Sequence, residues 1–227
     1  MRIGSYNSNE LSGNYHHKSA SVRFGIDLST SRSDGFPARQ EASEDSAYDN
    51  DSFNLKIGKS FANSELDFQY LGSRGQADYY NFLLSPVAQD YNNSLASVTA
   101  RINATDTWVS KIKLSYFEDE IEQQQSTDFL KTRRYELDWQ NDVAIGSANL
   151  LTAGLQTFRE NARSLSFGTN FDEDSDTVGL YSQNQFEAGS NSLTAGLRYT
   201  DHSAFDGKLT GELSYGYQVT PGNSLIA

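Results

Sequence analysis

The chain has 227 residues, a formal net charge of -12 at pH 7 and no cysteine. Its acidity argues against nucleic acid as a partner, because phosphate recognition needs a basic stripe and Lys and Arg do not cluster here. The lack of cysteine excludes a disulfide framework and a thiolate metal site. The mean hydropathy of -0.62 and the lack of an apolar run of roughly 18 residues exclude a transmembrane helix. They do not exclude a transmembrane β-barrel, in which every second residue of a crossing is apolar.

The opening residues, MRIGSYNSNE, lack the apolar core of a signal peptide, so either the chain stays in the cytoplasm or its true N-terminus is missing. About eleven segments of the chain alternate apolar and polar residues with the period of a β-strand, less cleanly near 2–16 and 178–187, and helical spacing fits the others no better. In chain order, their apolar positions include Val22/Phe24/Ile26/Leu28, Phe53/Leu55/Ile57, Leu66/Phe68/Tyr70, Ala96/Val98/Ala100/Ile102, Trp108/Ile112/Leu114/Tyr116, Leu151/Ala153/Leu155, Leu193/Ala195/Leu197/Tyr199 and Leu209/Leu213/Tyr215/Tyr217.

The segment RRYELDWQNDV, residues 133–143, raises the question of what such strands separate. One side of the extended chain carries the polar residues Arg134, Glu136, Asp138, Gln140 and Asp142. The other side carries Tyr135, Leu137, Trp139 and Val143. This broad apolar side predicts either the core of a soluble β-sandwich or a surface that faces lipid.

The connections alternate strictly between tight turns and longer polar stretches. The tight turns lie at 62–64, 103–106, 146–149, 189–191 and 221–223, and the long stretches cover roughly 32–51, 77–92, 118–128 and 161–176, followed by a brief one near His202. This alternation places all tight turns at one end of an up-and-down sheet and all long loops at the other. A propeller would also repeat at roughly this spacing, but its blades have four strands where each interval here has two.

Aromatic residues on the apolar side favour lipid over a sandwich core. Phe61, Trp108 and Tyr217 lie next to tight turns, and Tyr70, Tyr116, Tyr135 and Tyr199 lie at the opposite strand ends. For a strand tilted near 40°, the two groups form belts about 20 Å apart, which approaches the apolar band of roughly 25 Å in outer-membrane barrels. In a soluble sandwich, the charged side chains of 133–143 would lie on the solvent side of the sheet, and the strands would be longer than is usual for such a fold. We therefore predict an all-β, antiparallel, up-and-down transmembrane β-barrel.

Five stretches carry a resemblance to a known family: SRSDGF (31–36), YDNDSF (48–53), ADYYNFLLSPVAQD (77–90), RRYELDWQNDVAIGSANLLTAGLQ (133–156) and the long run 176–219. In this order and spacing, the chain resembles the barrel of TonB-dependent outer-membrane receptors, and among them the receptors for vitamin B12 (cobalamin). Such barrels have 22 strands and a plugged lumen. The resemblance implies that residues 1–227 are a partial barrel of about 11–12 strands, without the plug domain, the energy-coupling box and the closing strand. Open edges in lipid would leave backbone groups unpaired, so half a barrel should not fold alone.

The resemblance also implies a metal site. In the cobalamin receptors, carboxylates in the external loops bind calcium, and Asp49, Asp51, Asp78 and Asp90 occupy the matching positions. A further ligand position of the family is Pro37 here, which offers no side-chain oxygen. The alternative is that these acidic loops are simply solvated.

Other chemistry finds little support in the sequence. The acidic run at 172–176 is not an EF-hand, because Thr177 stands where Gly is required and Gln183 stands where Glu is required. No nucleophile elbow, Walker-type loop or H-E-x-x-H motif occurs, and the three histidines His16, His17 and His202 suggest structural roles. We therefore expect no enzyme and no catalytic residue.

The resulting hypothesis is a receptor in the bacterial outer membrane that captures a scarce large solute, cobalamin or a related corrinoid, with its external loops. Its implied partners are outer-membrane lipid, the small-molecule solute and the TonB complex, which would act through the missing N-terminal region. A siderophore receptor of the same family is one alternative, and a small passive porin or adhesin barrel is another. The sequence does not indicate which side chains contact the substrate.

Overall fold

The computed structural model describes residues 1–37, 44–220 and 222–226. These residues form thirteen β-strands: β1 (Arg2–Ile3), β2 (Asn9–Lys18), β3 (Val22–Ser33), β4 (Tyr48–Ser60), β5 (Ser64–Tyr80), β6 (Pro86–Thr105), β7 (Trp108–Gln123), β8 (Phe129–Ile145), β9 (Asn149–Ser166), β10 (Thr169–Ala188), β11 (Asn191–His202), β12 (Phe205–Thr220) and β13 (Asn223–Ile226). Within the described ranges, no helix is long and apolar enough to cross a membrane.

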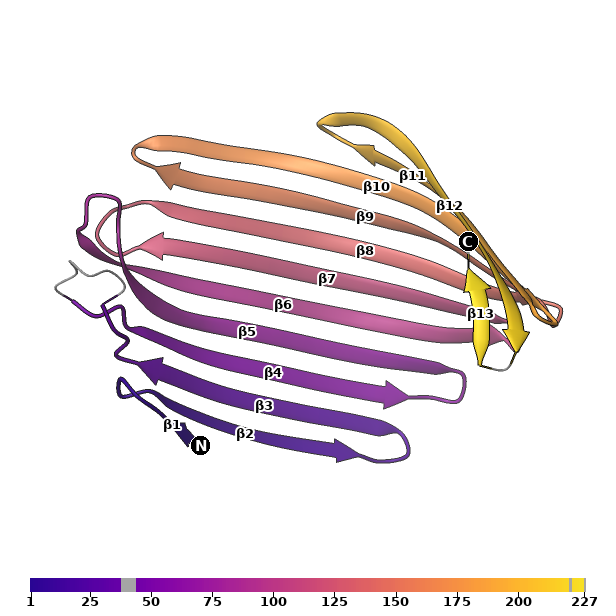
Figure 1. The fold of residues 1–227 in the computed structure, drawn as a ribbon, viewed down its shortest axis with the longest axis horizontal. Helices are drawn as coiled ribbons and strands as arrows, with labels where there is room; N and C mark the ends of the chain where they lie inside the picture. Colours follow the sequence, from indigo (N-terminus) through magenta and orange to yellow (C-terminus); the bar gives the residue numbers. More distant parts are fainter. Residues whose placement is uncertain (38–43, 221, 227) are drawn as a thin grey trace.

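Every strand pairs with the next one along the chain, so the thirteen strands form one antiparallel sheet in sequence order. The sheet is long and curved, and β11 to β13 bend away from the plane of the other strands (Figure 1). Eleven strands are long, while β1 and β13 have two and four residues. The predicted all-β, up-and-down architecture is confirmed, and the sheet is open, as expected for part of a barrel.

The strands pair in a register that places the apolar residues of each strand opposite the apolar residues of its neighbours. Tyr116 stands opposite Tyr135, Leu114 opposite Leu137, and Ile112 opposite Trp139. Since cross-strand partners point to the same face, the apolar positions of neighbouring strands merge into one continuous surface. We call this the outer face, and the face that carries Glu136 and its polar neighbours the inner face.

Neither face is covered by a second layer, so the soluble-sandwich alternative is wrong. Ala88 is the one buried hydrophobic residue among those described, and none of their side chains is fully enclosed. Leu197 and Leu213 on the outer face are 62% and 73% exposed. Leaving so large an apolar surface in water would be costly, whereas lipid is its natural solvent.

The long polar stretches differ from their prediction as loops, because most of their residues continue the strands. β5 runs to Tyr80 and β6 begins at Pro86, and only two residues, Phe167 and Gly168, separate β9 from β10. Stretch 32–51 is mostly a connection, and its residues 38–43 lie outside the described residues. The hydropathy signal fails here because both faces of a strand beyond the apolar band meet water, while the backbone still pairs. We call these continuations of the β5–β6, β7–β8 and β9–β10 hairpins the hairpin extensions.

Candidate functional site

The inner face of β8 to β11 is a connected polar surface. Gln156 donates from Nε2 to Oε1 of Glu136 at 2.9 Å and accepts a hydrogen bond from Nη2 of Arg198 at 2.8 Å. Nearby, the Thr152 hydroxyl donates to Asp142 at 2.7 Å. Ionised and amide groups need hydrogen-bond partners or water, so this face suits a polar, hydrated lumen and not an apolar core.

A second polar network covers the inner face of β2 to β5. Arg23 donates to the Asp67 carboxylate at 2.9 Å, and His16 Nε2 lies 2.8 Å from Oδ1 of Asp27. Asn54 donates to the other oxygen of Asp27 at 2.7 Å. This network places His16 in a structural role, in line with its prediction.

An apolar and aromatic strip interrupts the polar inner face. Leu71, Leu95 and Phe117 are cross-strand partners on β5, β6 and β7, and they line a groove of about 620 Å³. Phe117 stands opposite Arg134, whose guanidinium carbon lies 3.7 Å from the centre of the Phe158 ring. Flat rings beside a guanidinium suit ligands that combine aromatic surface with negative charge.

The outer face shows how the apolar band ends at both sides. The rings of Tyr116 and Tyr135 pack with centroids 4.9 Å apart, and Trp108 marks the turn end of the same strand pair. Between these belts, the indole nitrogen of Trp139 donates to the hydroxyl of Ser110 at 3.0 Å. That bond matters in lipid, where an unpaired donor would find no water.

Beyond the belt of tyrosines, the outer face of β7 to β10 becomes a ladder of ion pairs. Glu118 accepts from Arg133 at 2.7 Å and lies 3.2 Å from Lys131, which also bonds to Glu120 at 2.9 Å. The ladder continues through Arg159 and Asp174 at 2.9 Å and through Arg163 and Asp172 at 3.3 Å. We call this set the charged ladder. Charges in such number on the outer face mark the level at which lipid gives way to headgroups and water.

The tips of the hairpin extensions form a cavity of about 800 Å³. Its wall includes Tyr79, Ile121 and Leu130, and Phe82 and Phe167 stand at its rim with ring centroids 6.4 Å apart. The two phenylalanines are 74% and 82% exposed. We call this site the tip cavity. Aromatic rings that are exposed outside the lipid-facing band are typical of a surface that binds a ligand or another molecule.

Sequence reasoning missed the tip cavity. Phe82 and Phe167 lie in stretches that were predicted to be polar loops, where a single ring gives no periodic signal. A positive backbone angle at Phe167, with φ of 48°, is an additional mark of a constrained position, but it is visible in the structure alone.

The four predicted calcium ligands lie on adjacent strands of the outer face, Asp49 and Asp51 on β4, Asp78 on β5 and Asp90 on β6. Asp49 and Asp90 are separated by the strand of their common partner Gln76. Asp90 accepts from Gln124 at 2.9 Å, and Asp78 accepts from Gln76 at 2.8 Å.

These carboxylates do not converge into a cage. Among the described residues, no three His, Cys, Asp or Glu side chains are placed to hold a metal ion. Calcium prefers six to eight oxygen ligands, and Pro37 adds none. The arrangement does not fit a complete calcium site, and calcium binding stays a prediction.

A curved, open, antiparallel sheet with a belted apolar outer face and a polar inner face defines the wall of a transmembrane β-barrel. Residues 2–227 match the family model of the TonB dependent receptor-like β-barrel. The chain belongs to this family of receptors, whose barrels lie in the outer membrane of Gram-negative bacteria. The tight turns therefore mark the periplasmic end, and the hairpin extensions mark the cell exterior.

Solved structures share this fold at low sequence identity. The siderophore receptor PirA from Pseudomonas aeruginosa is 16% identical with a TM-score of 0.77, over 93% of this chain and 37% of that one. The FrpB iron transporter from Neisseria meningitidis is 13% identical with a TM-score of 0.76, over 96% of this chain and 43% of that one. The ferric-catecholate import receptor Fiu from E. coli K12 is 8% identical with a TM-score of 0.77, over 96% of this chain and 47% of that one.

The chain thus spans less than half the length of each of these three structures. No curated protein sequence matches the chain.

Proposed function

We propose that this chain is part of the wall of a receptor that imports iron bound to a siderophore. The observation that carries the proposal is the tip cavity, an exposed aromatic surface at the exterior end of a TonB-dependent receptor barrel. The structural neighbours whose names mention siderophores and iron support the choice of solute.

The inner face supports the same class of ligand. Many iron chelates present flat unsaturated groups and negatively charged oxygens. The rings of Phe117 and Phe158 offer stacking surfaces, and the guanidinium of Arg134 offers donors to such oxygens. We propose that the ligand is captured at the tip cavity and then passes along the strip of Leu71, Leu95 and Phe117.

A corrinoid is the second candidate, and the sequence resemblance at residues 133–156 and 176–219 favours it. This candidate includes the predicted calcium. If Asp49, Asp51, Asp78 and Asp90 hold calcium in the intact receptor, chelation should weaken corrinoid binding. Unchanged corrinoid affinity after chelation would contradict that assignment.

The two candidates are separated by uptake measurements on the host bacterium. A strain that lacks the gene for this chain should lose uptake of at least one radiolabelled ferric siderophore and keep uptake of radiolabelled cobalamin. Loss of cobalamin uptake alone would show that the transported solute is a corrinoid and not a siderophore. Unchanged uptake of both would favour a passive barrel or an adhesin.

The role of the tip cavity is tested with substitutions in the intact receptor. Phe82→Ser and Phe167→Ser together should lower ligand affinity about thirtyfold, because each exposed ring that stacks on a ligand contributes roughly 1 kcal/mol. Phe205→Ser is the matched control, since Phe205 is a similarly exposed ring, 75% exposed, at the tip of the β11–β12 hairpin and outside the cavity. Equal effects of both variants would contradict the proposal.

A further inference from the structure

The outer face of β2 to β6 carries a notch of about 770 Å³ at the exterior edge of the apolar band. Gly13 and Gly72 lie in the same cross-strand row as Leu28 and Phe53. The ring of Tyr70 covers Gly72, whereas the space over Gly13 is open. A Cβ added at Gly13 would meet nothing within 4 Å. Phe53 packs against Tyr70 of the belt with centroids 5.8 Å apart. The notch therefore begins as an apolar recess at belt level.

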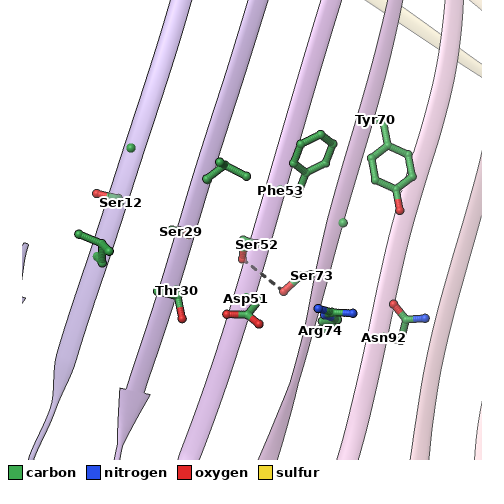
Figure 2. Close-up of a pocket in the computed structure, with 14 residues that line it drawn as sticks. Ser12, Ser29, Thr30, Asp51, Ser52, Phe53, Tyr70, Ser73, Arg74 and Asn92 are labelled. Atoms are coloured by element: carbon green, nitrogen blue, oxygen red, sulfur yellow. Dashed lines mark hydrogen bonds between the residues drawn. The ribbon is translucent and has the colours of Figure 1, made fainter.

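The next row towards the exterior is polar. Asp51 stands two residues beyond Phe53, about 7 Å along the strand, which is the distance from the belt into the headgroup layer. Arg74 is its cross-strand partner, with Thr30 and Asn92 on either side. Figure 2 shows these four side chains in one line across the strands, below the rings of Phe53 and Tyr70 in that view.

Asp51 and Arg74 differ from the charged ladder in one respect. In the ladder, acids and bases on neighbouring strands bond to one another at 2.7 to 3.3 Å. Asp51 and Arg74 are directly opposite, yet among the described residues neither forms an ion pair within 4 Å or a side-chain hydrogen bond. The notch thus offers one acid and one base, side by side, to a ligand at the membrane surface.

We propose that the notch binds an outer-leaflet lipid whose headgroup carries a phosphate and a primary ammonium, of which phosphoethanolamine is the simplest. Arg74 would donate to the phosphate and Asp51 would accept from the ammonium. The acyl chain would lie in the apolar recess over Gly13 and against Leu28 and Phe53. A choline headgroup has the same net charge but no N–H to donate, so the site discriminates between the two lipids.

The experiment measures lipid retention by the intact receptor that carries this chain. It is reconstituted in nanodiscs with equal amounts of phosphatidylethanolamine, phosphatidylcholine and phosphatidylglycerol, and the lipids that stay bound are counted by native mass spectrometry. The wild type should retain phosphatidylethanolamine over phosphatidylcholine. Asp51→Asn should lower that ratio about threefold to fivefold, the size of a solvent-facing ion pair. Arg74→Gln should lower retention of all three lipids.

Two further variants protect the test against misfolding and against non-specific charge effects. Gly13→Val fills the recess where there is open space, so it should reduce retention and leave the unfolding midpoint unchanged. Asp174→Asn removes an outer-face acid that is already paired, and it should leave the lipid ratio unchanged.

A ratio that is the same in the wild type and in Asp51→Asn would overturn the proposal. Retention that disappears on calcium chelation would also overturn it, because Asp51 would then serve a metal. Free phosphoethanolamine should not displace the lipid, and displacement at equal concentration would show that the recess for the acyl chain plays no part.

Discussion

Between the aromatic belts, the strands of this sheet alternate sharply between apolar and polar residues, while in the hairpin extensions the same strands continue without that pattern. Leu137 and Leu165 illustrate the difference, since both lie on the outer face, one in the apolar band and the other near the tip of β9. The backbone is paired equally well at both levels. The hydropathy pattern therefore reports the solvent on each side of a strand, and the strand itself ends where pairing ends.

The largest expected effect is a loss of folding free energy when the same change, leucine to arginine, is made inside and outside the apolar band. Leu137→Arg places a charge in the apolar band and should cost about 2 to 4 kcal/mol of folding free energy in lipid. Leu165→Arg makes the same change beyond the charged ladder and should cost less than about 1 kcal/mol. Urea titration of the receptor in lipid vesicles measures both, and equal losses would show that the two levels share one solvent.

A smaller effect is expected within the charged ladder. Glu118 joins Tyr116, Lys131 and Arg133, and its side chain is 16% exposed. Glu118→Gln removes the negative charge and one of the two acceptor oxygens that these donors share, and it should cost about 1 to 3 kcal/mol. Asp172→Asn breaks a pair whose partners are about half exposed and should cost at most about 1 kcal/mol. The comparison fails if the exposed pair proves to be the more stabilising one.

At the tip of the β9–β10 hairpin, a single substitution should increase local stability and weaken ligand binding. Phe167 and Gly168 both have positive φ, 48° and 77°, as the two-residue turn requires, and Asn tolerates that conformation better than Phe. Phe167→Asn should therefore raise the free energy of local opening at the tip by a few tenths of a kcal/mol, which slower amide hydrogen exchange would report. The same change should weaken ligand binding, because it removes a rim of the tip cavity. Weaker binding together with a less protected tip would favour misfolding as the cause.

The smallest expected effect is the response of the ladder to acid. Hydrogen bonds from Arg159 and Asn161 hold the pKa of Asp174 below its usual value of 3.8. Since the folded pKa is depressed, the stabilisation is present above the unfolded pKa and is lost as the pH falls through the folded pKa. Amide exchange around β9 and β10 should be unchanged from pH 7 to about 5 once corrected for intrinsic rates, and it should quicken only below 3.8. Loss of protection near pH 6 would point to another group.

Much of the fold was predictable because lipid imposes a simple rule on every crossing strand. The alternation at 133–143 and the tight turn at 146–149 predicted the two faces, the pairing direction and the end of the sheet at which the tight turns lie. The extensions were not predictable in this way, since residues such as Glu118 and Asp172 meet water or ion pairs on a face that is apolar a few residues earlier.

The sites were less predictable than the fold, because they depend on which strands are neighbours. Asp51 was recognised as a candidate ligand, but its partner Arg74 and the open space over Gly13 emerge only from the structure. The calcium assignment rests on resemblance, and the spacing of Asp49, Asp78 and Asp90 across three strands was not visible in the chain.

The central claim is that, between Tyr135 and Val143, the odd residues of β8 face hydrocarbon and the even residues face an aqueous lumen. Because the chain has no cysteine, single cysteines at 135–143 can be introduced one by one and labelled with a nitroxide in the intact receptor in lipid. We expect odd positions to be relaxed by oxygen, which concentrates in the bilayer, and even positions by a water-soluble nickel chelate, with a period of two. Access of the nickel chelate to Leu137 and Trp139 equal to that at Glu136 and Asp138 would contradict the account.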